Sequence, residues 1–117
     1  MSNPCNALRD WLSVKFPLAR IQLGRWEDQG AEETHIVIKP MGGYSGDYLR
    51  RPRIELILIG PLNAPTFALT DMAYVILGAA RTETISGLGG VLPSDPFFES
   101  AATGRPQCTI DLEVMTT

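Results

Sequence analysis

The most restrictive feature of the sequence is the run RIELILIG, which begins at Arg53. Its even-numbered apolar residues would share one face of a β-strand, whereas Ile57 and Ile59 would lie on the opposite face with Arg53. A strand that is apolar on both faces must be covered on both sides, by a helix or by a neighbouring subunit. Gly60 and Pro61 end the strand, because proline cannot donate to a β-ladder.

Other segments also have strand patterns. We predict strands over 19–27, 35–40 and 107–115, and one short strand near 91–97. The polar acidic segment EDQGAEET joins the first two as a hairpin loop. The last strand alternates apolar and polar residues, which predicts one buried face and one wet face.

Two helices are expected. Asn3 and Pro4 suit a helix start, and Pro17 disfavours helical geometry at Phe16, so the first helix should end there. The segment 63–81 repeats apolar residues at helical spacing and should dock on the sheet.

The element order α-β-β-β-α-β predicts an α+β fold, with two helices flanking a mostly antiparallel sheet of about four strands. Two long Gly/Pro-rich loops are expected, at 41–53 and 82–106. The length of 117 residues suits one domain, over 1–117.

Composition limits the function. The net charge of -3 argues against general nucleic-acid binding, although a local basic patch remains compatible with it. We expect a soluble protein without a signal peptide or membrane span, assembled in the cytoplasm. Cys5 and Cys108 lack metal-ligand spacing, so we expect reduced, small apolar side chains; a disulfide between them has no support.

No catalytic, cofactor or metal site is predicted. His35 is the single histidine, and no nucleophile or carboxylate can be placed beside it. The glycine-rich runs GGYSG and GLGG lack the setting of a phosphate-binding loop. Glu32 and Glu33 are too few ligands for a metal.

The arginine cluster of Arg50, Arg51 and Arg53 is the main candidate site. These arginines are either solubilising charges that flank an aggregation-prone apolar strand, or a contact with another subunit or with DNA. The acidic segment EDQGAEET (27–34) could form ion pairs with these arginines in a neighbouring copy. Head-to-tail contacts of this kind can close into a ring. Ile57 and Ile59 are candidate interface residues. Arg105 is another candidate, because Arg105-Pro106 leads into a predicted strand in the same way as Arg51-Pro52. The acidic candidates are Glu27, Asp28, Glu32 and Glu33.

The pattern resembles the small tail terminator (tail completion) proteins of long-tailed bacteriophages, some of which are called minor tail or minor capsid proteins. The resemblance rests on a glycine-rich loop with YLRRPR before an apolar strand, the helix TDMAYVILGAAR, and a last strand in GRPQCTIDLEVM. It covers most of the chain as an order of elements.

The resemblance implies a structural virion protein at the head-tail junction rather than an enzyme. Family members form a hexameric ring on the head-proximal end of the tail tube, stop tube polymerisation and offer a surface to the head's connector or stopper protein. DNA passes through the lumen of the ring. The alternatives are another neck or head-completion protein and a small ligand-binding α+β domain.

Overall fold

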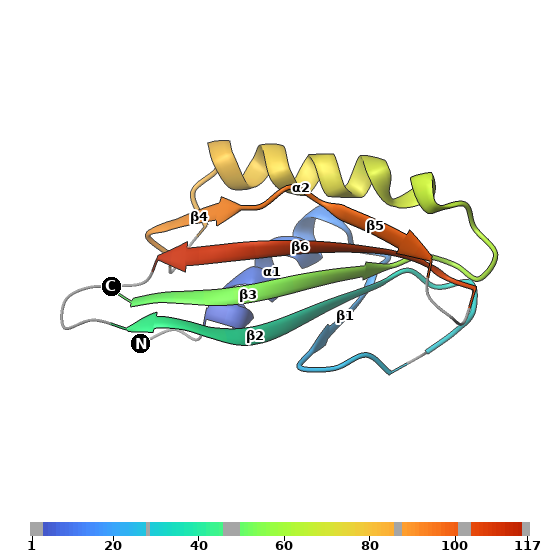
Figure 1. The fold of residues 1–117 in the computed structure, drawn as a ribbon, viewed down its shortest axis with the longest axis horizontal. Helices are drawn as coiled ribbons and strands as arrows, with labels where there is room; N and C mark the ends of the chain where they lie inside the picture. Colours follow the sequence, from blue (N-terminus) through green and yellow to red (C-terminus); the bar gives the residue numbers. More distant parts are fainter. Residues whose placement is uncertain (1–3, 28, 46–49, 86–87, 101–103, 116–117) are drawn as a thin grey trace.

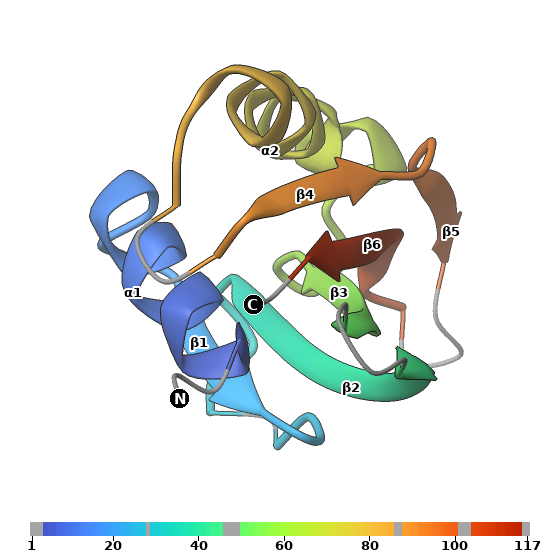
Figure 2. The ribbon, with the colours of Figure 1, turned by 90° about the vertical axis from the view of Figure 1, so that its left-hand side faces the viewer.

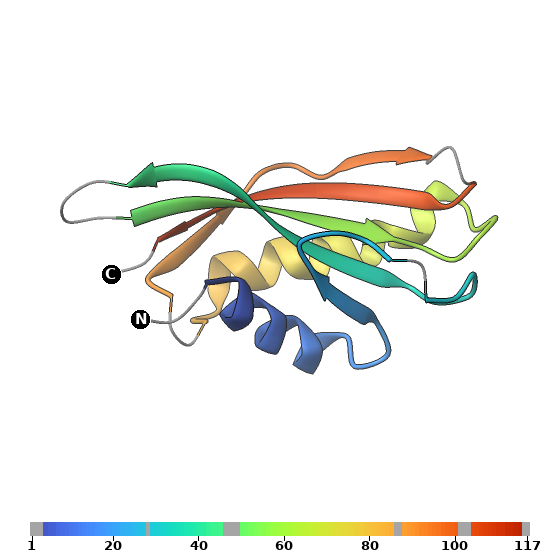
Figure 3. The same cartoon turned by 90° about the horizontal axis from the view of Figure 1, so that it is seen from below.

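Two helices lie on one face of a mixed sheet, and none of the described helices lies on the other face (Figure 3). The computed structural model describes residues 4–27, 29–45, 50–85, 88–100 and 104–115. Within these residues the sheet has six strands in the order β1-β2-β3-β6-β4, and β5 also pairs with β6 (Figure 1). The elements are α1 (Pro4–Lys15), β1 (Arg20–Leu23), β2 (His35–Ser45), β3 (Arg50–Ile59), the 3-10 turn η1 (Thr66–Leu69), α2 (Thr70–Thr82), β4 (Gly90–Pro93), β5 (Phe97–Ser100) and β6 (Pro106–Met115).

The α+β class is confirmed, but the expected sheet differs from the observed one. The described residues form six strands instead of about four, and β1 runs parallel to β2 while the other pairings are antiparallel. Helix α1 packs against β1 and β2, and α2 packs against β4 (Figure 2).

The predicted hairpin between the first two strands is therefore wrong. Gly24 has a φ of 90°, which ends β1 well before the predicted residue 27. The Gln22 side chain then holds the chain in its return path, because its Nε2 donates to the Glu27 carbonyl (2.7 Å) and its Oε1 accepts from the Glu27 N–H (2.8 Å). The segment 24–34 thus returns along the sheet instead of making a tight turn.

The glycine-rich segment after residue 40 was expected to be a loop, yet much of it is strand. β2 continues to Ser45 and β3 already begins at Arg50. The register shifts between Pro40 and Gly43, which marks a β-bulge. The glycines of this segment therefore accommodate an irregularity in the β2–β3 pairing instead of ending the strand.

The segment 82–106 contains two short strands where one was predicted. β4 and β5 pair with the same strand, β6, and one extra residue lies between them, as the register change from Pro93↔Leu112 to Phe97↔Thr109 requires. Ser94 fills this bulge: its N–H donates to the Asp111 carbonyl (2.8 Å), and its Oγ accepts from the Asp111 N–H (3.0 Å).

The helices follow their sequence patterns closely. α1 ends at Lys15, one residue before the predicted end, and the Phe16 N–H still donates to the Leu12 carbonyl (2.8 Å). The helix predicted from residue 63 starts later, because Asn63 adopts a left-handed φ of 63° and a 3-10 turn precedes α2.

The core lies between the helices and one face of the sheet. Leu8 and Leu12 of α1 are fully buried there, which contributes about 1.5–3 kcal/mol each. The predicted inward positions of β3 and β6 belong to the same core. Cys5 and Cys108 are buried there and form no disulfide with each other. The inward residues are Ile54, Leu56, Leu58, Cys108, Ile110, Leu112 and Val114.

Candidate interaction surface

The β2–β3 hairpin extends beyond its neighbouring strands as a two-stranded arm (Figure 1). β1 pairs with β2 only as far as Ile38, and β6 pairs with β3 only from Arg53 onward. Within the described residues, strand segments 43–45 and 50–52 therefore pair with each other alone. We call these two segments the arm. A two-stranded ribbon is marginally stable in water, so the arm is a natural place for a partner to add contacts.

The arginine cluster is divided between the arm and the sheet. Arg50 and Arg51 were predicted to precede the strand, but their backbones belong to the arm, opposite Ser45 and Tyr44. The side chains of Arg50 and Arg51 lie outside the described part of the structure. Arg53 lies in the sheet proper, and its side chain is exposed.

The face of the sheet without helices, here called the outer face, carries ordered charges. The strand register places Lys39 beside Glu55 and Glu55 beside Asp111, and it places Arg53 beside Glu113. Opposite charges on directly paired residues, as at Lys39–Glu55 and Arg53–Glu113, stabilise a sheet by about 0.2–1 kcal/mol for each pair. The like charges of Glu55 and Asp111 are destabilising. A depression on this face, at the β4–β6 edge, is lined in part by Arg53 and the exposed Leu92.

The predicted interface residues Ile57 and Ile59 also point to the outer face, as alternation requires. Ile57 is half-buried, and Ile59 is buried within the chain. The covering expected on this face thus comes in part from the chain itself. The aromatic ring of Trp26, in the connection between β1 and β2, contacts the buried His35 ring edge-on with centroids 5.9 Å apart.

The acidic segment lies where it cannot meet the arm of its own copy. Glu32 and Glu33 directly precede β2, and the arm is the far end of that strand. Eleven residues of strand span about 35 Å. The molecule measures 46 Å along its longest axis, so these opposite charges occupy separate regions of an elongated subunit.

Among the described residues, the acidic side chains have only weak partners. Glu33 lies 3.7 Å from Arg20, and Glu27 lies 3.3 Å from Arg25, both in exposed ion pairs. Such pairs contribute at most about 1 kcal/mol, so they leave these carboxylates available to a stronger partner. Glu32 is exposed, and Asp28 lies outside the described residues.

Arg105, predicted as an interface residue, is instead an internal anchor. Its side chain is 1% exposed. Nε donates to the Gly60 carbonyl (2.9 Å), Nη2 donates to the Glu33 carbonyl (2.6 Å), and the guanidinium carbon lies 5.4 Å from the centre of the Trp26 ring. One side chain thus ties the end of β3 and the β1–β2 connection to the start of β6.

His35 belongs to this anchor. Its Nε2 accepts from the Gln29 N–H (3.0 Å), and its Nδ1 lies 3.4 Å from Arg105 Nη2. The imidazole is fully buried and engaged on both nitrogens, in line with the structural role expected for it. The Trp26–His35–Arg105 cluster could not be predicted from the sequence, because Arg105 lies 70 residues after His35.

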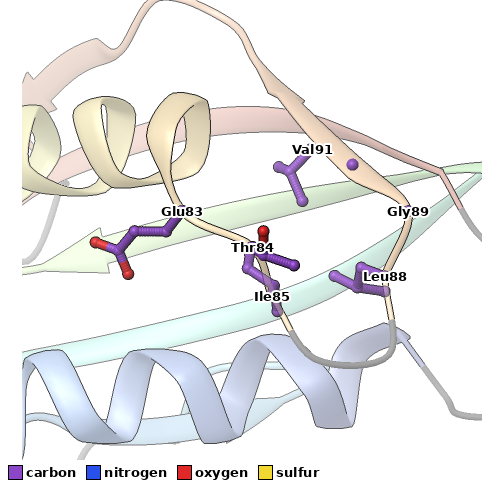
Figure 4. A pocket seen from close by; sticks show the side chains of 7 residues that line it. Glu83, Thr84, Ile85, Leu88, Gly89 and Val91 are labelled. Carbon is purple, nitrogen blue, oxygen red and sulfur yellow. The ribbon is translucent and has the colours of Figure 1, made fainter.

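A small pocket lies between the end of α2 and the start of β4 (Figure 4). Its volume of about 90 Å³ is well below the 300–1,000 Å³ typical of ligand sites. The Glu83 carboxylate at its edge accepts from Lys15 Nζ (2.7 and 2.8 Å) and from Trp11 Nε1 (3.2 Å). These hydrogen bonds, with Lys15 the larger cause, lower the pKa of Glu83. The carboxylate therefore joins α1 to the end of α2.

Among the described residues, no group of three or more histidine, cysteine or acidic side chains is arranged to hold a metal ion. None of the described helices is long and apolar enough to cross a membrane. No protein-family model matches this chain, and no curated protein matches it either.

Proposed function

We propose that this protein forms a ring at the head-proximal end of a phage tail tube, where it stops tube polymerisation and provides the joining surface for the head. The ring would be a homohexamer, its partners would be the tail tube protein and the head's connector or stopper protein, and DNA would only pass through the lumen. The element order and the resemblance of YLRRPR and GRPQCTIDLEVM to tail terminators motivate this proposal.

The observation that carries the proposal is the separation of the arm from the acidic segment. The arm bears Arg50 and Arg51, and the acidic residues Glu32 and Glu33 precede the other end of the same strand. Complementary charges at opposite ends of one chain favour head-to-tail contacts, which generate rings when the rotation closes. Such charges contribute orientation and register more than affinity.

Mixing the purified protein with isolated tail tubes tests this function. Electron microscopy should reveal rings capping one end of each tube, and added tube protein should no longer lengthen the capped tubes. Rings that bind DNA-filled heads but never bind tubes would instead indicate a head-completion protein. A protein that stays monomeric with tubes present would contradict the tail-terminator function.

A further inference from the structure

The outward side of α2 is apolar although no described residue covers it. Tyr74 is 59% exposed and Val75 is 49% exposed, and Phe67, about two turns before them in η1, is 76% exposed. At 3.6 residues per turn these positions lie on one side, together with Asp71 and Gly78, whereas the core residues of α2 lie on the opposite side. We call this side the α2 outer stripe.

Gly78 lies at the centre of this stripe, within the helix. A Cβ built at Gly78 would meet no atom within 4 Å, and its backbone does not have a left-handed φ. Glycine inside a helix costs up to about 1 kcal/mol relative to alanine, so the described chain itself gains nothing from the missing side chain. A bare patch of helix backbone does allow a second helix to approach closely.

The stripe is complementary to itself. Tyr74 and Gly78 lie two residues before and after Ile76, and Asp71 and Arg81 lie five residues before and after it. Two copies of α2 packed antiparallel about a two-fold axis at the level of Ile76, whose own side chain faces the core, would set each Tyr74 on the partner's Gly78. The same axis would bring each Asp71 to the partner's Arg81.

The charges are available for such a contact. Asp71 and Arg81 are exposed, and within the described residues neither has an ion-pair partner. Each charge suits its own end of the helix, since acidic groups favour the first turn and basic groups the last. An antiparallel pair therefore brings the acidic end of one helix to the basic end of the other.

We infer that the α2 outer stripe is a two-fold contact with a second copy of this chain. The contact is isologous, because the same residues serve both subunits. A helix of 13 residues is about 20 Å long, so the buried area falls below that of stable complexes and the dimer is weak and concentration-dependent. It uses neither the arm nor the acidic segment, so it stands independently of the proposed ring.

Sedimentation velocity of the protein alone, over a series of concentrations, tests this inference. The wild type should show a dimer that grows with concentration. Asp71→Arg and Arg81→Asp should each weaken the dimer about ten-fold or more, because symmetry turns two attractive pairs into two repulsive ones. The double variant, which restores both pairs, should recover the dimer.

Control variants separate this contact from general effects of charge and folding. Arg9→Asp changes an exposed charge on α1 by the same amount and should leave the dimer unchanged. Gly78→Leu should abolish the dimer by displacing the partner's Tyr74, while its thermal melt shows that the monomer still folds. A wild type that remains monomeric at every concentration, single reversals that dimerise normally, or a double variant that fails to recover would each overturn the inference.

Discussion

Replacing Arg105 with alanine tests whether this buried side chain anchors the fold. The substitution leaves the Gly60 and Glu33 carbonyls without their guanidinium donors, and each unsatisfied buried carbonyl costs about 1–3 kcal/mol. Loss of the contact with the Trp26 ring adds about 0.5–2 kcal/mol. Because water can enter the vacated space and bind one carbonyl, we expect the free energy of unfolding to fall by about 3–5 kcal/mol.

Urea denaturation followed by tryptophan fluorescence measures this loss, since Trp26 reports directly on the cluster. A domain of this size is stable by about 5–15 kcal/mol, so the alanine variant should unfold at a much lower urea concentration. Arg105→Lys, which keeps the charge but loses the fork of donors, should fall between the variant and the wild type. Arg9→Ala is the matched surface control, with an expected change within about 0.5 kcal/mol. An Arg105→Ala midpoint no lower than that of Arg9→Ala would refute the anchoring role.

Two further predictions concern titratable groups. Because the folded state lowers the pKa of Glu83, its contribution to stability is complete above the ordinary glutamate pKa and is lost as pH falls through the folded value. Glu83→Gln should therefore lower the melting temperature at pH 7 but not at pH 2, whereas an equal loss at both pH values would contradict this linkage; Glu99→Gln is the exposed control. Burial raises the pKa of the Cys108 thiol to about 11, so iodoacetamide at pH 8 should label Cys108 only after denaturation, and rapid labelling of the native protein would show that the thiol is accessible.

The periodicity of the sequence predicted the parts of the fold that depend on burial. The inward faces of β3 and β6 and the extent of α1 follow from residues whose spacing matches one side of a strand or helix. The direction of β1 could not be predicted in this way. A polar segment such as 24–34 fits a hairpin loop equally well, and only contacts with distant residues, such as the Leu62 N–H to the Ala31 carbonyl (2.7 Å), fix its path.

The candidate site was predicted only in outline. The arginine cluster and the acidic segment are visible as charges, but their placement at opposite ends of β2 depends on how far the glycine-rich hairpin stays paired. Arg105 was misplaced for a related reason. An arginine between glycine and proline looks like a surface loop residue, and the carbonyls that bind it come from segments far away in the sequence.

The proposed ring requires that subunits join head to tail through the arm and the acidic segment. Arg50→Glu with Arg51→Glu makes one variant, and Glu32→Arg with Glu33→Arg makes the other. Each contact changes from two attractive pairs to two repulsive ones, a change of about 1–4 kcal/mol, with about ten-fold or more in affinity expected at each contact. Neither variant alone should therefore form rings on tail tubes.

An equimolar mixture of the two variants restores opposite charges at every contact of an alternating ring. Mass measurement of the particles capping the tubes is the most direct test. We expect mixed rings containing equal numbers of both variants, and no rings from either variant by itself. Rings assembled by each variant alone, or no recovery on mixing, would contradict the proposed ring.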